Sequence, residues 1–229
     1  SASYGNAGHF SPYASLQLNR YDDLSDVPSM LTNTRGPLAL KWNYIPKMIP
    51  WLSKFVLNCS QKKMMYTAKY MHQILDLSLS AYDELFDEIN LEGLVENNGI
   101  MYVWENKGIK SRELEIKIRN ELGIKQKILN KKEVHDLEPN IKPFYSGGVF
   151  YEYARHAKNP KKIAQKLFKK FLDNGGKFEK IYIKDINFEN KKPILITDNS
   201  KLKFDKLVIA CGAFSKKLTD KLKEKIPLD

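Results

Sequence analysis

The sequence has few of the residues that stabilise small secreted domains or bind metal ions. Only two cysteines occur in 229 residues, Cys59 and Cys211, and neither has a C-x-x-C partner or a histidine at ligand spacing. This excludes a disulfide framework and a zinc site. The four histidines are also scattered, so we expect no metal site. Both cysteines are expected to be buried thiols in a reducing compartment.

Long hydrophobic runs are absent too. No stretch reaches the roughly 18 apolar residues that a membrane-spanning helix needs, and the N-terminus has no signal-peptide pattern. Hydrophobic residues nevertheless make up 42% of the chain, which is typical of a globular protein rather than a disordered one. The length is sufficient for one large domain or two smaller ones. We expect a cytoplasmic protein.

Arginine is scarce although the formal net charge is +11. Only five of the 38 basic residues are arginine, and the remainder are lysine. Arginine is the residue that reads phosphates and bases through its planar fork. The composition therefore favours a solvated lysine-rich surface and no nucleic-acid site. A non-catalytic basic binding module is the alternative, and it would bind DNA or RNA in a salt-sensitive way.

The middle of the chain predicts helices around a strand. Apolar residues at three- and four-residue spacing predict a long amphipathic helix over residues 64–89. A strand is expected around Met101, and a helix over residues 111–122. Asn130 and Glu133 form a capping-box pattern, which predicts a short helix after Asn130.

The last third predicts strands on either side of a helix. A strand is expected around Val149, and a helix begins at Pro160. Three strand candidates follow, at residues 178–186, 194–197 and 207–211. The last is a continuous apolar run, typical of a central parallel strand buried on both faces, and it ends in a tight turn of small residues. A strand of this kind predicts α/β structure in the last third of the chain, and we expect α+β structure before it. Ligands bind at such turns in open α/β sheets.

The chain opens with a similar concentration of small residues, SASYGNAGHFSP. Bare backbone of this kind lets amide groups come close to a phosphate or a flat ring. In order along the chain, five segments resemble the FAD-dependent oxidoreductases of the D-amino-acid oxidase superfamily, most closely the small subunit of bacterial D-amino-acid dehydrogenases and next the glycine oxidase-like enzymes. They are SYGNAGHFSP, the tryptophan-rich stretch near Trp51 with the long helix after it, GGVFYEYARHAKNP, GGKFEKIYIKDI and KLVIACGAFSKKL.

This resemblance implies a fold and a division of the chain. Part of a FAD-binding Rossmann-like domain would carry an inserted helix-rich substrate domain. Residues 1–13 would form a flavin-contacting loop, and residues 14–150 a segment of the substrate or cap domain. Residues 151–229 would be the return to the FAD-binding domain.

The resemblance also implies site residues. The opening loop would lie along the flavin, between the pyrophosphate and the isoalloxazine, and His9 would either look into the substrate pocket or simply pack there. Ile183 would meet the adenine ring through its backbone, and the turn after residues 207–211 would pack near the phosphoribityl region. The loop residues are Ser3, Gly5, Asn6, Ala7 and Gly8, and the turn residues are Ala210, Gly212 and Ala213.

The activity that the resemblance implies is oxidation of an amino acid, a D-amino acid in particular, at its α-carbon. Hydride would pass to the flavin, and water would hydrolyse the imino acid to a keto acid and ammonia. A dehydrogenase of this type passes electrons to a respiratory quinone. Trp42, Trp51 and the neighbouring lysines then suggest a peripheral contact with the inner membrane, although we favour a helical edge packed on the rest of the domain.

Two parts of the family pattern are missing from the sequence. One is the G-x-G-x-x-G turn with its flanking strands and helix, and the other is the C-terminal half with the arginine that grips the substrate carboxylate. We therefore expect an internal fragment of a longer flavoenzyme, inactive by itself and unable to hold FAD alone. A degenerate relative that has kept the fold and lost the cofactor is a further alternative.

Overall fold

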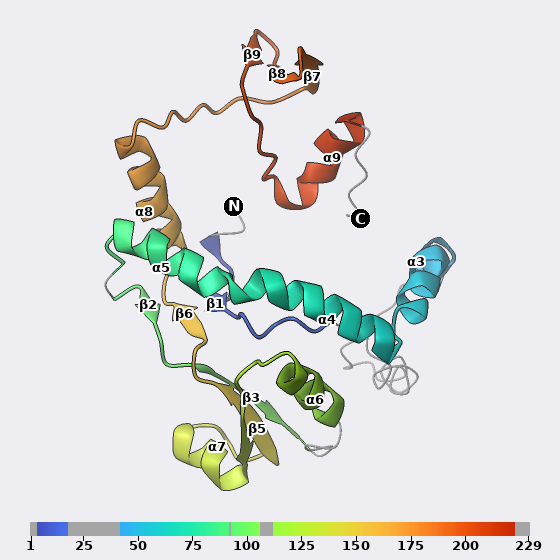
Figure 1. The fold of residues 1–229 in the computed structure, drawn as a ribbon, viewed down its shortest axis with the longest axis vertical. Coiled ribbons are helices and arrows are strands. Elements are labelled where there is room, and N and C mark those ends of the chain that lie inside the picture. Colours follow the sequence, from blue (N-terminus) through green and yellow to red (C-terminus); the bar gives the residue numbers. More distant parts are fainter. Residues whose placement is uncertain (1–3, 18–41, 92, 106–111, 223–229) are drawn as a thin grey trace. The chain divides into compact units, whose positions relative to one another are not determined.

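A computed structural model describes residues 4–17, 42–91, 93–105 and 112–222 of the chain. The fold mixes helices with short sheets, as the sequence predicts (Figure 1). It divides into two compact units, residues 1–170 and residues 171–229. The segmentation at residues 13 and 150 that the resemblance implies stays a prediction.

The first unit combines short strands with helices of up to sixteen residues. Its strands are β1 (His9–Phe10), β2 (Val95–Glu96), β3 (Ile100–Trp104), β4 (Lys127–Asn130), β5 (Gly147–Tyr151) and β6 (Arg155–Ala157). Its helices are η2 (Trp42–Tyr44), α3 (Ile45–Leu57), α4 (Gln61–Asp76), α5 (Ser78–Glu88), α6 (Glu113–Glu121), α7 (Lys131–Leu137) and α8 (Pro160–Asp173), the last of which runs on into the second unit.

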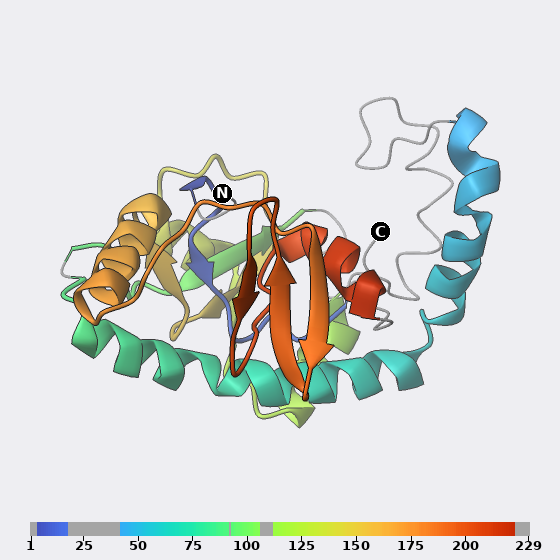
Figure 2. The ribbon, with the colours of Figure 1, turned by 90° about the horizontal axis from the view of Figure 1, so that it is seen from above.

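The predicted long amphipathic helix is present as two helices, α4 and α5, separated at Leu77. Figures 1 and 2 show them as one nearly continuous rod. The rod begins where the Ser60 side chain accepts a hydrogen bond from the Lys63 amide, an N-cap interaction. Met64 and Ala68 lie on its buried stripe and pack against Ile118 of α6. The apolar spacing therefore identified the packed face correctly in the first half of α4, whereas Met71, on the same predicted stripe, is 41% exposed.

A three-stranded antiparallel sheet with β5 in its centre separates two clusters of apolar side chains. Leu129, Val134 and Tyr145 form the cluster that includes α7. Tyr13 and Tyr151 belong to the other cluster. The helix α7 begins as predicted, since the complete capping box between Asn130 and Glu133 is formed. This sheet is the core of the first unit.

A second sheet holds the opening loop in place. Its central strand is β6, which pairs antiparallel with β1 on one side and with β2 on the other. After β6 the chain turns into α8, where the Asn159 side chain accepts a hydrogen bond of 3.0 Å from the Lys162 amide. This is the predicted N-cap, with Pro160 as the first helical residue. Ile163 of α8 then packs against Ala157 of β6.

The second unit contains an antiparallel meander and a short helical turn. The strands are β7 (Asp185–Glu189), β8 (Lys192–Ile196) and β9 (Lys201–Lys203), drawn in orange and red in Figure 2. Among its described residues, Ile186, Pro193 and Ile194 are the buried apolar ones. The helical turn consists of η4 (Gly212–Phe214), α9 (Ser215–Thr219) and η5 (Asp220–Leu222).

Two strand predictions in this unit are corrected by the structure. Residues 178–184 are not in a strand, because β7 starts only at Asp185. Residues 207–211 are not a strand either, and Val208 is 85% exposed. An apolar run becomes a buried parallel strand only when strands pair with both of its edges, and no described residue pairs with this run. For the same reason Cys211 is exposed rather than buried, whereas Cys59 is buried as predicted.

Candidate functional site

The opening loop is held by hydrogen bonds around Gly8. The Gly8 amide donates to the Asn6 side-chain oxygen at 2.7 Å, and the Gly8 carbonyl accepts from the Ala157 amide at 2.7 Å. Gly8 has a φ of +71°, and a Cβ added there would lie 2.5 Å from the Ala157 oxygen. Strand β6 therefore already requires glycine at this position, before any cofactor is considered.

The preceding part of the loop is open. Tyr4, Gly5, Asn6 and Ala7 are exposed, and a Cβ added to Gly5 would meet no atom within 4 Å. Tyr4 is 65% exposed, and the Lys161 ammonium lies 4.7 Å from its ring centroid. Packing against the described residues therefore explains why position 8 is a glycine, but it does not explain the glycine at position 5.

The loop borders a cleft of about 420 Å³. Its walls come from the loop and β1, from α5, from β6 and from α8. The lining is made mostly of small and apolar side chains: Asn6, Ala7, Gly8, His9, Phe10, Tyr82, Ala157, Pro160, Ile163, Ala164 and Leu167. A cleft of this size is at the lower end of small-molecule sites, roughly 300–1,000 Å³. The lining fits a planar, partly apolar group such as one end of a flavin.

The most polar ring at this cleft belongs to His9. It is exposed on β1 and lies directly opposite His156 of β6, with the two ring centroids 5.4 Å apart. Its neighbour Phe10 makes an edge contact with Tyr82 of α5, at 4.8 Å between centroids. His9 can therefore present an imidazole to a ligand, beside the aromatic rings of Phe10 and Tyr82.

An ion pair ties α5 to β6 and so fixes the distance between two walls of the cleft. Arg155 of β6 donates hydrogen bonds to both carboxylate oxygens of Asp83, with Nη2 at 3.0 Å from Oδ2. The hydrogen bond from Arg155 lowers the pKa of the Asp83 carboxyl. Because a fork of two parallel bonds restricts orientation, the pair holds Tyr82 beside Phe10.

The other predicted flavin contacts lie in the second unit. Ile183 is half-buried in the segment before β7. Ala210 and Ala213 are exposed, and Gly212 begins η4 with a φ of +55°. The structure thus brings the three turn residues into one exposed turn that leads into α9. Ser3 lies outside the described residues.

Several cleft residues were not predicted from the sequence. Tyr82 was expected only as part of the apolar stripe of the long helix. Ala157 lies in the segment GGVFYEYARHAKNP but was given no role of its own, and Ala164 lies in none of the segments that carry the resemblance. They reach the cleft through strand pairing and through the docking of α8 on β6, which no local pattern encodes. Among the described residues no group of three or more histidine, cysteine or acidic side chains is placed to hold a metal ion.

The curated proteins that match this chain are named D-amino-acid oxidase or D-amino acid dehydrogenase. A D-amino-acid oxidase from Bradyrhizobium diazoefficiens is 30% identical over 230 residues, which cover 100% of this chain and 55% of that protein. A D-amino acid dehydrogenase from Vibrio cholerae is 24% identical over 84% of this chain and 47% of its own length. The chain therefore spans about half the length of the curated relatives that it matches.

Solved structures show the same fold at low identity. Glycine oxidase from Geobacillus kaustophilus matches 97% of this chain and 48% of its own, with a TM-score of 0.57 and 14% identity. L-alpha-glycerophosphate oxidase from Mycoplasma pneumoniae, solved with FAD bound, matches 96% of this chain and 47% of its own, with a TM-score of 0.58 and 14% identity. The family profile described as FAD dependent oxidoreductase (DAO) matches residues 1–229. The chain belongs to this DAO family of FAD-dependent oxidoreductases, whose cofactor is FAD.

Proposed function

We propose that this chain is part of an enzyme that oxidises a D-amino acid with FAD. The observation that carries the proposal is the open, bare backbone of the loop from Gly5 to Ala7, next to a cleft lined by small residues. The names of the two relatives support the substrate class. An exposed backbone amide approaches a flat, anionic cofactor more closely than a side chain would allow.

The flavin would be held by backbone from two parts of the chain. Ser3, Gly5, Asn6, Ala7 and Gly8 would lie along it, between the pyrophosphate and the isoalloxazine. The turn would pack near the phosphoribityl region, and the segment before β7 would meet the adenine ring. These last contacts would come from Ala210, Gly212 and Ala213, and from Ile183.

FAD, when bound, supplies the acceptor for a hydride that leaves the substrate α-carbon. His9 would orient the amino acid by hydrogen bonding from the cleft wall, without acting as a base. Phe10 and Tyr82 would exclude water from the side of the cleft that they line. Alignment of this kind accounts for a large part of catalysis when the cofactor carries the chemistry. Water would then hydrolyse the imino acid product to a keto acid and ammonia.

The electron acceptor would be a respiratory quinone, reached through a peripheral contact with the inner membrane. Helix α3 contains no buried residue, and Ile49 and Trp51 are exposed on it together with two lysines, Lys47 and Lys54. A helix with apolar and basic side chains and no acidic residue is suited to an anionic membrane surface. The side chain of Trp42 lies outside the described residues. Among the described residues no helix is long and apolar enough to span a bilayer.

Cosedimentation tests the membrane contact. The protein expressed from its complete reading frame would be mixed with vesicles that contain phosphatidylglycerol, at low and at high salt. We expect binding at low salt that Trp51→Ala and Lys54→Gln weaken. No binding at low salt would refute the contact and leave the amino-acid oxidation untouched.

The test of the proposed activity is anaerobic reduction of the bound flavin. D-alanine, L-alanine and glycine would each be added to the FAD-loaded protein from the complete reading frame. We expect D-alanine to bleach the flavin absorbance and to yield pyruvate and ammonia in equal amounts, with L-alanine at least tenfold slower. Bound flavin that no amino acid reduces would refute the proposal, and a folded protein that binds no flavin would instead support a degenerate relative.

A further inference from the structure

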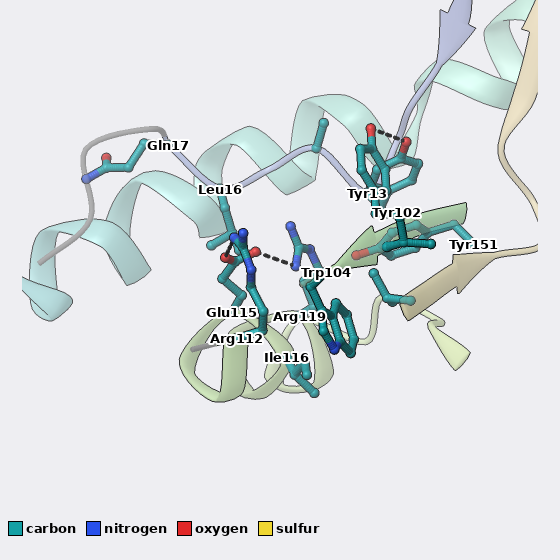
Figure 3. Close-up of a pocket in the computed structure, with 13 residues that line it drawn as sticks. Tyr13, Leu16, Gln17, Tyr102, Trp104, Arg112, Glu115, Ile116, Arg119 and Tyr151 are labelled. Atoms are coloured by element: carbon teal, nitrogen blue, oxygen red, sulfur yellow. Dashed lines mark hydrogen bonds and ion pairs between the residues drawn. The ribbon is translucent and has the colours of Figure 1, made fainter. Parts of the chain in front are cut away.

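The rod formed by α4 and α5 has apolar side chains on two opposite faces. Its inner face is covered, because Leu16 and helix α6, both drawn in Figure 3, pack around Met64 and Ala68. Phe86 of α5 continues this inner face and packs against the cluster that contains Ile163 of α8. These contacts account for the apolar residues of one face of the rod only.

The outer face of the rod carries a second row of apolar side chains. In an α-helix, positions three and four residues apart fall on one side. Five exposed residues have this spacing on the side of the rod away from Met64 and Ala68: Tyr66, Tyr70, Ile74, Leu77 and Ala81. We call these five residues the outer stripe. It extends over about 22 Å of the rod.

The outer stripe is not covered by the described part of the chain. Ile74 and Leu77 are 69% and 67% exposed, and the rings of Tyr66 and Tyr70 lie 4.7 Å apart between centroids, with most of their contact to each other. A surface helix ordinarily has one apolar and one polar face. A helix with apolar side chains on both faces is typical of one that packs on both sides, and contiguous exposed apolar patches mark interaction surfaces.

The charges of the rod are divided along its length. Residues 61–75 contain three lysines and no acidic residue, whereas residues 76–88 contain five acidic residues and no lysine or arginine. A second rod that runs in the opposite direction places acidic residues beside the lysines, and a parallel one places like charges together. The division of charge therefore favours an antiparallel partner with the same sequence.

The outer stripe also matches its own reverse. Tyr70 and Leu77 lie four residues before and three residues after Ile74, and Tyr66 and Ala81 lie eight before and seven after it. In an antiparallel pair centred on Ile74, each tyrosine therefore comes opposite a smaller side chain of the second copy. Ile74 meets its own counterpart at the two-fold axis, as in any contact between identical surfaces.

One edge of the outer stripe adds a pair of opposite charges to this alignment. Lys62 lies twelve residues before Ile74, and Asp87 lies thirteen residues after it. Helical spacing puts both on the same edge of the stripe, and both are exposed. An antiparallel pair then brings Lys62 of each copy beside Asp87 of the other. Within one copy the two residues are about 37 Å apart along the rod.

We propose that the outer stripe binds the outer stripe of a second copy of this chain, with the two rods antiparallel. Two helix faces of this length bury less than the roughly 1,600 Å² of a standard interface, so the dimer dissociates on dilution. The contact leaves the cleft free, because Tyr82, which lines the cleft, lies on the inner face of α5 beside Phe10. The proposal is therefore independent of the proposed activity.

Sedimentation equilibrium tests the dimer over a range of concentrations of the protein from its complete reading frame. We expect the mass of two copies at high concentration and the mass of one copy at low concentration. Ile74→Glu places two carboxylates side by side at the two-fold axis and should leave the protein monomeric at every concentration. Leu137→Glu, at an exposed leucine of α7, is the matched control and should dimerise like the parent.

The antiparallel direction is tested by exchanging the charges at the edge of the stripe. Lys62→Glu and Asp87→Lys each turn two ion pairs of the dimer into two repulsions, which should raise the dissociation constant about tenfold. The double variant restores both pairs and should dimerise like the parent. Because the two positions are far apart within one copy, this rescue can arise only between copies.

Three results would overturn the proposal. A protein that is monomeric at every concentration would mean that something other than a second copy covers the outer stripe. A dimer that Ile74→Glu leaves intact would place the contact elsewhere, and no rescue in the double variant would contradict the antiparallel arrangement. Should Ile74→Glu fail to fold by circular dichroism, the two charge variants and their combination decide. None of these results depends on flavin binding or on turnover.

Discussion

His9 of β1 and His156 of β6 face each other across a strand pair, with ring centroids 5.4 Å apart and ring planes at 62°. Their surroundings differ. His9 is exposed and lines the cleft, whereas His156 is half-buried and does not line it. Comparing variants of the two histidines therefore separates the contribution of the ring contact to stability from a role of His9 in the cleft.

Replacing either histidine by alanine should cost a similar amount of stability and have a different effect on activity. An edge-to-face ring pair contributes about 0.5–1.5 kcal/mol, so His9→Ala and His156→Ala should each lower the free energy of unfolding by that order. In the FAD-loaded protein only His9→Ala should raise the KM for the amino acid, by about tenfold. Denaturant unfolding and steady-state kinetics provide the two readings. An equal rise in KM for both variants would mean that His9 acts only by packing.

Two buried tyrosines, Tyr13 and Tyr151, and the half-buried Tyr153 predict a loss of stability at high pH. Burial raises the pKa of Tyr151 and of Tyr153 to about 12 from an ordinary value of 10.0, and it raises the pKa of Tyr13 further. The unfolded chain loses these protons first, so the free energy of unfolding is unaffected below pH 10 and falls as the pH rises from 10 towards 12. Tyr151→Phe should make this fall shallower.

The control for the alkaline experiment is Tyr182→Phe, because Tyr182 is 75% exposed. It should leave the pH dependence of unfolding as in the parent protein. Urea unfolding at several values between pH 8 and pH 11 is the measurement. The same slope in Tyr151→Phe and in the parent would show that this phenol does not contribute.

The capping box of α7 gives a prediction about stability alone. Asn130→Ala removes the acceptor for the Glu133 amide, a hydrogen bond of 3.0 Å, and should lower the free energy of unfolding by about 1 kcal/mol. Asn130→Asp keeps an acceptor and should recover most of the loss. Asn187→Ala, at an exposed position of β7, should have little effect. Thermal unfolding by circular dichroism distinguishes the three, and equal stability of Asn130→Ala and the parent would contradict the capping assignment.

The features that the sequence predicted correctly depend on neighbouring residues. The cap at Asn130 and the N-terminus of α8 at Pro160 require contacts only three residues away. The buried stripe of α4 follows from the helical repeat alone. These features form within one segment and do not depend on how the rest of the chain folds.

The features that were missed depend on distant partners. Residues 207–211 have the composition of a buried strand, yet a strand exists only where another strand pairs with it. The contact of His9 with His156 joins residues from opposite ends of the first unit, and no spacing rule relates them.

Two glycines of the opening loop test the central claim, that this loop binds FAD. Gly8→Ala would place a Cβ 2.5 Å from the Ala157 oxygen at a φ of +71°, and it should lower the free energy of unfolding by about 1–3 kcal/mol even without flavin. Gly5→Ala would meet no atom of the described chain within 4 Å. It should leave the stability of the flavin-free protein unchanged.

The decisive measurement is the FAD affinity of Gly5→Ala, determined by flavin fluorescence quenching on the protein from the complete reading frame. If the cofactor passes along this loop, the added methyl group meets the flavin, and the affinity should fall at least tenfold while the melting temperature of the flavin-free protein stays the same. FAD affinity equal to that of the parent would contradict the account, because the bare backbone at Gly5 would then serve no cofactor.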